Sequence, residues 1–321
     1  MVIVVIASII FYFAFLIYSN AHDVALALSG FAWWLLPLMF MLAMANYLLR
    51  GLKWSYYLDV LGIKLSKKRS YLIFMSGLSM SITPAKIGEV LKSYLLKKDA
   101  GTPIMTGVGI VFVERVTDLL GMMGLLCVGL IAFRYDMMPA GNLMLVGIIF
   151  VILAAVILLA CNKRLVINAL NFLERKKHAK KFARGMKDSY LGAHSLFGPK
   201  PLFIGFWLSF FSWSFECLCL FVALAGLGIH LNLLSVVFIF AFSSIIGAIS
   251  MIPGGIGSTE ASMALLLVYA GAGIALSMAT ATAAVILVRI ATLWFAVVLG
   301  IIALMLWQRK NVEKNGKPSN Q

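Results

Sequence analysis

Charged residues are scarce in this chain of 321 residues. Asp, Glu, Lys and Arg make up 12% of the sequence, whereas hydrophobic residues make up 62%. A soluble globular domain carries roughly 25% charged residues, so this composition excludes a soluble protein. Apolar runs of about 20 residues, long enough to cross a bilayer, recur along the sequence. The composition therefore predicts an all-α polytopic membrane protein, with residues 1–321 forming a single membrane domain.

Acidic residues are the scarcer charged group. The sequence has 12 Asp and Glu against 27 Lys and Arg, which gives a formal net charge of +15. The basic residues lie in loops between apolar spans, so the anions nearest to them are lipid headgroups and not nucleic acid. The simpler explanation of the same pattern is topology, because Lys and Arg collect on the cytoplasmic side of membrane proteins. Either way, membrane lipids are the expected partner, and no nucleic acid is expected.

Cysteine and histidine are also rare. The four cysteines, Cys127, Cys161, Cys217 and Cys219, lie in or at the edge of apolar spans. None is spaced with a histidine as zinc ligands are, so we expect packing residues and no disulfide framework. The four histidines, His22, His178, His194 and His230, are scattered over the connections. The sequence predicts no metal site and no cofactor.

Full membrane spans are expected in six places, at about 1–18, 32–50, 103–133, 142–161, 202–226 and 278–306. Basic residues concentrate in three segments, which are 50–69, 162–201 and the tail after Trp307. The positive-inside rule therefore places both termini in the cytoplasm of a multi-pass protein of the cell (inner) membrane. The basic segment 162–201 is expected to form one or two amphipathic interfacial helices, and the tail 309–321 is expected to be disordered.

Two further apolar stretches, 70–98 and 235–271, are broken by Pro and Gly and share the pattern S-x-x-P-x-x-I-G followed by a glutamate. The first reads Ser81-Ile82-Thr83-Pro84-Ala85-Lys86-Ile87-Gly88-Glu89. The second reads Ser250-Met251-Ile252-Pro253-Gly254-Gly255-Ile256-Gly257, with Glu260 three residues on. The predicted orientation makes 70–98 enter and return on the cytoplasmic face and 235–271 on the outer face. We therefore expect two re-entrant helical hairpins in an inverted-topology repeat of about 32–133 and 202–306, a design that recurs in transporters.

Charged residues also occur inside the predicted spans. They are Glu114, Arg115 and Asp118 in 103–133, Glu216 in 202–226, and Arg289 in 278–306. A charge at membrane depth costs at least about 2.5–3.5 kcal/mol, so each needs a partner or a water-lined cavity. One interpretation is a structural cluster that locks helices together, with Arg115 paired to Glu260 and Arg289 paired to Glu89. The other, which their arrangement around two hairpin tips favours, is a site in which both arginines face one shared cavity.

The first hairpin tip carries two lysines, Lys86 and Lys92. Both are candidates to bind a phosphate, but both could equally extend to the inner interface of the bilayer. Trp33, Trp34, Trp54 and Trp307 fall at span ends and are expected to form the interfacial aromatic belt. The tip residues themselves are expected to be Pro84, Gly88, Pro253, Gly254, Gly255 and Gly257. Exposed backbone at such tips is tolerated only in protein or beside water.

Three segments, PAKIGEVLKSYLL, ERVTDLLG and PGGIGSTEASMALLL, resemble the signature segments of the lysylphosphatidylglycerol synthase transmembrane region, also called the flippase-like domain family. The resemblance covers about residues 30–306. It implies a membrane domain that translocates lipids or lipid-linked groups, with functional residues at Glu89, Arg115, Glu260 and Arg289. The full-length synthases carry a soluble aminoacyl-transferase domain after the membrane part. The sequence ends about 15 residues after the last span, so aminoacylation of lipid is not expected.

The leading functional hypothesis is a flippase or transporter, and not an enzyme, for an anionic phospholipid or a polyprenyl-phosphate-linked lipid. In this hypothesis the cationic side chains bind the phosphate, and the carboxylates Glu114, Asp118 or Glu260 exchange protons that couple the cycle. A second hypothesis is an integral-membrane transferase that modifies a lipid. A third is a non-transporting accessory subunit of an envelope-lipid pathway. The headgroup, the direction of movement and the oligomeric state do not follow from the sequence.

Overall fold

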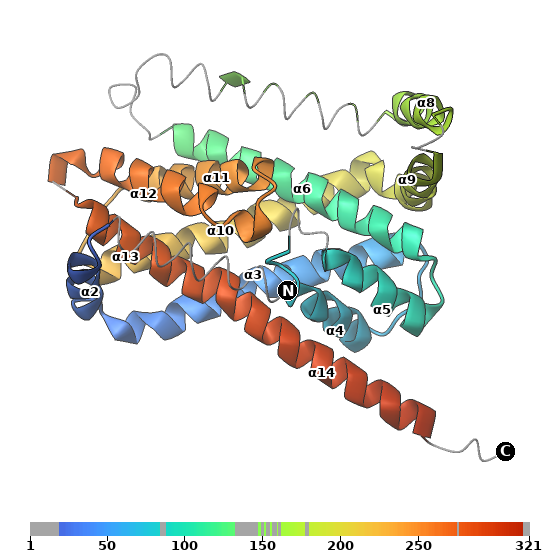
Figure 1. Ribbon diagram of the computed structural model, residues 1–321, viewed down its shortest axis with the longest axis horizontal. Helices are drawn as coiled ribbons and strands as arrows, with labels where there is room; N and C mark the ends of the chain where they lie inside the picture. The colour runs from blue at the N-terminus through green and yellow to red at the C-terminus, as the bar shows by residue number, and fades with distance from the viewer. Residues whose placement is uncertain are drawn as a thin grey trace.

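Helices make up all of the regular structure in the part of the chain that the computed structural model describes (Figure 1). The described residues are 19–83, 88–131, 162–176, 180–274 and 276–316, with isolated positions between 147 and 159. In chain order the helices are α2 (Ala21–Ser29), α3 (Leu36–Val60), α4 (Lys67–Leu78), α5 (Leu91–Ala100), α6 (Ile104–Leu130), α8 (Lys163–Glu174), α9 (Lys180–Ala193), α10 (Pro199–Gly226), α11 (Leu233–Ile249), α12 (Ser258–Ala270), α13 (Met278–Arg289) and α14 (Phe295–Gly316). The short turns between them are the 3-10 helices η1 (Trp33–Leu35), η4 (His194–Phe197), η5 (Pro253–Gly255) and η6 (Ala272–Ile274), and the π-helix η7 (Ile290–Trp294). The predicted all-α class is confirmed.

Among the described residues, three helical segments are long and apolar enough to cross a membrane, namely Trp33–Val60, Pro199–Gly226 and Met278–Arg309. They correspond to the predicted spans 32–50, 202–226 and 278–306. Helix α6 corresponds to the predicted span 103–133 and has 27 residues, but three charged residues lie in its middle. The predicted span 1–18 and most of 142–161 lie outside the described residues.

Helix α3 is longer than the sequence suggested. It continues from the predicted end at residue 50 to Val60, and Arg50, Lys53 and Trp54 are all buried in it. The assignment of both basic residues to a cytoplasmic loop, and of Trp54 to the interfacial belt, was therefore wrong. A helix that packs against protein on one face can bury charged side chains there. The sequence analysis placed the end of this span at its first charged residue, Arg50, and therefore ended it too early.

The C-terminal helix also extends further than predicted. Helix α14 runs to Gly316, whereas we expected a disordered tail from residue 309 onward. Trp307 is buried and its indole Nε1 donates a hydrogen bond to Asp99 Oδ2 at 3.2 Å, so it is anchored in protein instead of forming part of an interfacial belt. Trp33 and Trp34, by contrast, are exposed.

Helix α6 lies at the centre of the packing, in contact with α5, α9, α10 and α11. Glycines permit this close approach, as small residues do where membrane helices meet. A Cβ at Gly109 would lie 2.2 Å from the carbonyl oxygen of Ser189 on α9, and one at Gly121 would lie 2.8 Å from the backbone nitrogen of Phe210 on α10. The charged residues of α6 are thus held among closely packed neighbours.

Each broken stretch forms two helices that pack against each other, α4 with α5 and α11 with α12. In the first, α4 is capped by Ser66, whose hydroxyl accepts a hydrogen bond from the Arg69 amide. In the second, the chain passes from α11 through η5 before α12 begins. Helix α14 lies across α4, where a Cβ at Gly300 would be 2.1 Å from the Ser79 amide nitrogen.

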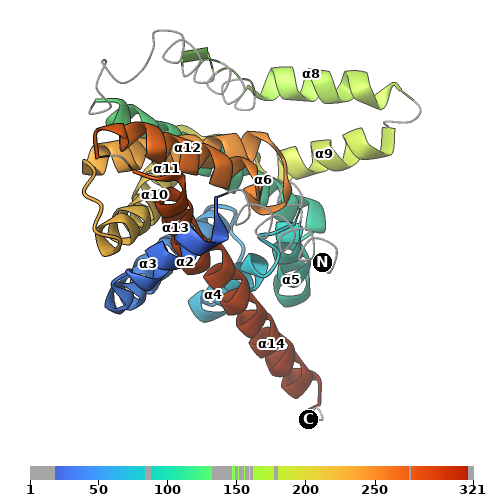
Figure 2. The ribbon, with the colours of Figure 1, turned by 60° about the vertical axis from the view of Figure 1, so that its left-hand side comes forward.

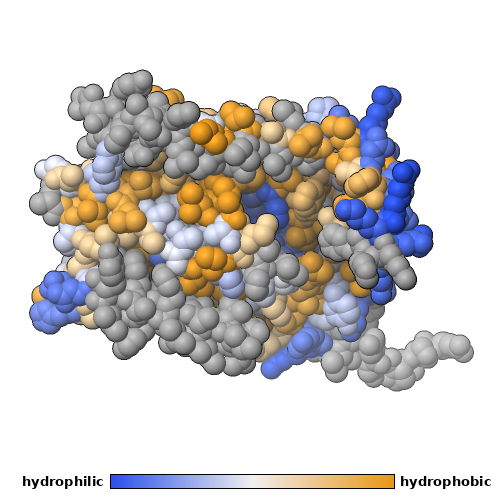
Figure 3. Space-filling model, turned by 45° about the horizontal axis from the view of Figure 1, so that its top comes forward, coloured by the Kyte–Doolittle hydropathy of each residue, from blue (hydrophilic) through white to orange (hydrophobic). Residues whose placement is uncertain are grey.

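Helices α8 and α9 form a hairpin beside this helical body, with α9 against α6 and α8 outermost (Figure 2). No residue of α8 is buried, and Leu165 and Phe172 are exposed along it. Helices therefore occur where the sequence predicted amphipathic ones. In Figure 3 a hydrophilic patch lies near the middle of the face with hydrophobic residues on both sides of it, and further hydrophilic residues gather at the right edge.

Candidate functional site

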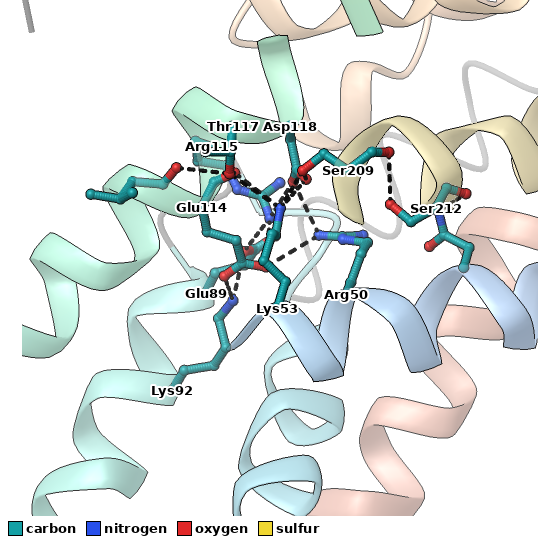
Figure 4. Close-up of polar contacts among 12 residues, drawn as sticks. Arg50, Lys53, Glu89, Lys92, Glu114, Arg115, Thr117, Asp118, Ser209 and Ser212 are labelled. Atoms are coloured by element: carbon teal, nitrogen blue, oxygen red, sulfur yellow. Dashed lines mark hydrogen bonds and ion pairs between the residues drawn. The ribbon is translucent and has the colours of Figure 1, made fainter. Parts of the chain in front are cut away.

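Seven charged side chains meet in the interior where α3, α5 and α6 converge (Figure 4). They are Arg50 and Lys53 from α3, Glu89 and Lys92 at the start of α5, and Glu114, Arg115 and Asp118 from α6. We call this set the α6 network. Helical spacing explains how it assembles, because residues three or four apart lie on the same face. Arg50 and Lys53 are three residues apart on α3, Glu89 precedes α5 and is three residues from Lys92, and Asp118 is three and four residues from Arg115 and Glu114 on α6.

Asp118 is the most closely bound carboxylate in the α6 network. Its Oδ1 lies 2.5 Å from Lys53 Nζ and accepts a hydrogen bond from Ser209 at 3.1 Å. Its Oδ2 lies 3.1 Å from Arg115 and 3.6 Å from Arg50. Lys53 is fully buried and also donates to the Ser209 hydroxyl at 2.7 Å. Three cations therefore surround one carboxylate.

Glu114 is bound in a similar way. Lys92 donates to its Oε2 at 2.6 Å, while Arg115 and Arg50 lie 3.3 and 3.7 Å from its Oε1. Lys92 also lies 3.2 Å from Glu89 Oε2, and Arg115 lies 3.2 Å from the same oxygen. Aromatic rings enclose the cations further: Lys92 Nζ is 5.0 Å from the centre of the Trp54 ring, within cation–π range.

A second charged pair lies in the other half of the chain. Arg289, the last residue of α13, places its Nε 2.7 Å from Glu260 Oε1. Glu260 Oε2 accepts a hydrogen bond from the Gly257 amide at 2.7 Å, at the start of α12. Gly257 has φ +99°, a backbone conformation that side-chain-bearing residues rarely adopt. The glycine and the glutamate together begin the helix and place the carboxylate beside Arg289.

The helix is irregular just after Arg289. Residues Ile290–Trp294 form a π-helical turn, a feature that often marks functional sites. The Tyr47 hydroxyl donates a hydrogen bond to the Thr292 carbonyl in this turn. Helix α3 thus contacts both charged regions, with Tyr47 at the π turn and Lys53 in the α6 network.

One cavity of about 300 Å³ connects the two regions. Its charged lining residues are Arg50, Arg115, Asp118, Glu216 and Arg289. Ser81 contributes from the first broken stretch, and Gly254 and Gly255 contribute from the second. Among these lining residues three arginines face two carboxylates, so the charge balance of the wall is positive. The two arginines singled out in the sequence, Arg115 and Arg289, do face one shared cavity.

The ion pairs differ from those expected. The structure pairs Arg115 with Glu89 and Arg289 with Glu260, so each arginine pairs with the glutamate of its own half and the crossed pairs were wrong. Lys92 is buried and does not extend to the bilayer interface. The pairing of Glu89 and the burial of Lys92 have the same local cause. The two residues are three apart, and α5 packs on α6, so both side chains meet the charged residues of α6.

The other predicted site residues have mixed outcomes. Glu216 is buried and lines the cavity. Gly88 donates its amide to the Thr83 hydroxyl at 2.8 Å, as part of the first break. Pro253 begins η5. Pro84 and Lys86 lie outside the described residues.

Arg50 and Lys53 are the functional candidates that sequence reasoning missed. Their signal was present, since they are three residues apart at the end of an apolar helix and would share a face. Their basic character suggested a loop instead. A search for helical spacing across the predicted span end would have found them.

The fold and the site define a helical membrane protein with a positively lined cavity between two halves of its chain. The model of the family described as the lysylphosphatidylglycerol synthase TM region matches residues 2–300, and the chain belongs to this family. It is similar to a UPF0104 membrane protein of Methanocaldococcus jannaschii, with 33% identity over 190 residues, which cover 58% of this chain and 77% of the relative. A UPF0104 membrane protein of Methanothermobacter thermautotrophicus is 27% identical over 319 residues, covering 92% of this chain and 90% of the relative. The family resemblance inferred from the three sequence segments is confirmed.

Proposed function

We propose that this protein is a flippase-like transporter that moves an anionic phospholipid or a polyprenyl-phosphate-linked lipid across the cell membrane. The observation that carries the proposal is the shared cavity, since arginines from both halves of the chain and residues of both helix breaks line it. Arginine suits phosphate, because its planar guanidinium can donate two parallel hydrogen bonds to the oxygens. A site formed between two halves can open to either side as the halves move, which is how inverted-repeat transporters work.

The size of the cavity fits a headgroup better than a whole lipid. Ligand pockets typically have volumes of about 300–1,000 Å³, and this one lies at the lower limit. The acyl or polyprenyl chains would remain in the bilayer while the phosphate enters the protein. Such a division needs no nucleophile, so the proposal is transport of an unchanged lipid and not an enzymatic reaction.

The proposed topology has six full spans, with α4–α5 and α11–α12 as re-entrant hairpins that enter from opposite faces, and both termini in the cytoplasm. Single cysteines at Ser81 and Ser250, in a background where Cys127, Cys161, Cys217 and Cys219 are replaced by Ser, test it. Ser81 lines the cavity, and Ser250 is next to the lining residue Met251, so both positions should react slowly and only with small thiol reagents that reach the cavity. Labelling that shows either stretch crossing the membrane completely would contradict the hairpins.

Transport itself can be measured with reconstituted protein and fluorescent lipids. Labelled phosphatidylglycerol should cross the vesicle membrane faster with the protein than without it, whereas labelled phosphatidylcholine should not. The variants Arg115→Leu and Arg289→Leu should insert normally and lose this activity. If both variants instead fail to accumulate as folded protein, the two arginines hold the helices together and the transport proposal loses its support.

Proton coupling through Glu114, Asp118 or Glu260 stays a prediction. Intramembrane carboxylates commonly serve as proton relays in transporters. An imposed pH gradient should then accelerate lipid movement, and at least one of Glu114→Gln, Asp118→Asn and Glu260→Gln should remove the acceleration. A rate that ignores the gradient in all four proteins would show that these carboxylates are structural counter-ions.

A further inference from the structure

Arg115 has an unusual position within the α6 network. Its Nη2 lies 3.1–3.3 Å from three different carboxylates, those of Glu89, Glu114 and Asp118. Its side chain is nevertheless 25% exposed, compared with 0% for Lys53 and 2% for Lys92. Arg115 lines the cavity, whereas both lysine side chains are enclosed. Arg115 is thus the cation of the α6 network that a ligand in the cavity can reach most readily.

Every carboxylate that Arg115 contacts is also held by another cation. Lys92 lies 3.2 Å from Glu89 and 2.6 Å from Glu114. Lys53 lies 2.5 Å from Asp118. Removing Arg115 from these contacts would therefore leave no carboxylate of the α6 network without a cation. An uncompensated buried charge is among the costliest features of a folded protein, so this redundancy has energetic weight.

We infer that Arg115 exchanges its carboxylate partners for the phosphate of the ligand, while Lys53 and Lys92, together with Arg50, keep those three carboxylates neutralised. The two lysines are positioning residues that do not touch the ligand. This inference rests on the proposed function and extends it, because it names the cation that moves and the side chains that make its movement inexpensive. It also assigns a role to Lys53, a fully buried cation that the transport proposal does not otherwise use.

The exchange predicts that the carboxylates compete with the ligand for Arg115. The variant Glu89→Gln removes one competitor while keeping the shape of the side chain. Binding of dioctanoyl phosphatidylglycerol to the full-length protein in detergent, measured by titration calorimetry, should become about 3–10-fold tighter, since a hydrogen bond to a charged partner is lost only from the free state. If Glu89 instead orients Arg115 for the ligand, the same variant would bind more weakly, and that result would overturn the inference.

Glu174→Gln supplies the matched control. Glu174 also pairs with an arginine, Arg184, at 2.6 Å, but on the exposed α8–α9 hairpin. The same substitution there should leave the affinity for dioctanoyl phosphatidylglycerol unchanged. An equal increase in both variants would show a general effect of lowering negative charge and would contradict the exchange.

The lysines are tested by restoring the charge balance. Lys92→Met keeps an unbranched apolar stem but leaves Glu89 and Glu114 to hold Arg115 more firmly, so binding should weaken about tenfold. Adding Glu89→Gln to it should return the affinity to within about threefold of the unmodified protein. A merely structural lysine, or one that binds phosphate itself, would not be rescued in this way. A double variant as weak as Lys92→Met therefore refutes the positioning role.

Different results would contradict the proposed function and the exchange of partners by Arg115. If the unmodified protein binds dioctanoyl phosphatidylglycerol no better than dioctanoyl phosphatidylcholine, the proposed function itself is wrong and the exchange falls with it. If it prefers the anionic lipid but Arg115→Gln binds as well as the unmodified protein, the exchange is wrong while the preference for an anionic lipid stands. If Lys92→Met fails to fold, Glu89→Gln still tests the exchange, because the exchange predicts tighter binding of the lipid and an orienting role of Glu89 predicts weaker binding.

Discussion

The two halves of the chain hold their glutamates by different means. In the part of the chain that the structure describes, two cations lie 3.2 Å from Glu89 in the first half, those of Lys92 and Arg115. Glu260 in the second half is held by Arg289 and by a backbone amide, that of Gly257. Both cations of Glu89 are shared with Glu114, so they can rearrange among several carboxylates, whereas the amide that binds Glu260 is fixed by the start of α12. We therefore expect the first half to be the more adaptable side of the cavity and the second half to be its more rigid side.

The largest expected effect is on the α6 network. Asp118→Leu leaves Lys53 fully buried without its closest carboxylate, and breaking a buried pair in this way typically costs about 3–5 kcal/mol of unfolding free energy. Asp118→Asn, which can still accept a hydrogen bond from Lys53, should cost less. Thermal unfolding in detergent measures both. Equal stability of Asp118→Leu and the unmodified protein would show that the α6 network is not a stabilising unit.

A smaller effect is expected at the corresponding residue of the second half. Glu260→Ala removes both the ion pair with Arg289 and the hydrogen bond from Gly257, and hydrogen bonds to charged groups contribute about 1.5–3 kcal/mol. Glu260→Gln retains an oxygen that can accept from the amide and should recover part of the loss. Thermal unfolding in detergent measures the stability of both variants. If Glu260→Gln were as unstable as Glu260→Ala, the interpretation of the second half as the rigid side would be wrong.

The pattern S-x-x-P-x-x-I-G was visible twice in the sequence because it depends on residue types that the backbone requires. The shared pattern located Glu89, Glu260, Arg115 and Arg289, and the structure places both arginines in the wall of one cavity. The pairing partners could not be derived, since which carboxylate meets which arginine depends on how the helices pack. Lys53 was missed for a different reason, because a basic residue just past the predicted end of a span suggested a loop, although its spacing of three from Arg50 was visible in the sequence.

Gly88 and Gly257 occupy the same position in the shared pattern, but a glycine is required there for different reasons in the two halves. Gly257 needs its φ of +99°, so Gly257→Ala should cost on the order of 1–3 kcal/mol of backbone strain. At Gly88 the requirement is space, since a Cβ there would lie 2.6 Å from the Met80 Cβ and from the Thr83 Oγ1. Thr83→Ser removes the Thr83 Cγ2 methyl, which would lie 2.7 Å from the new Cβ, and should therefore relieve Gly88→Ala in part. No change to a neighbouring side chain should relieve Gly257→Ala, and such a rescue would contradict the backbone explanation.

The smallest effect is expected outside both halves, at the exposed Glu174–Arg184 pair. The hydrogen bond from Arg184 lowers the pKa of Glu174 below its ordinary value. A lowered pKa in the folded state means that the pair stabilises the α8–α9 hairpin above the unfolded pKa of about 4.3 and loses this effect as the pH falls through the folded pKa. Hydrogen exchange of α8 amides should therefore differ slightly between the unmodified protein and Glu174→Gln at pH 7, and the difference should vanish in acid. A difference that grows as the pH falls would show that the pair stabilises the hairpin most in acid and would contradict this prediction.

The proposed function requires that the cavity between the halves binds an anionic lipid through Arg115 and Arg289. This binding can be tested by mass spectrometry of the lipids that co-purify with gently extracted protein. The unmodified protein should retain an anionic or lipid-linked phosphate species enriched over the surrounding membrane, and the Arg115→Gln/Arg289→Gln variant should lose that enrichment while remaining folded. A lipid profile equal to that of the bulk membrane would contradict the claim. So would an enriched acceptor–product pair, which would indicate an enzyme.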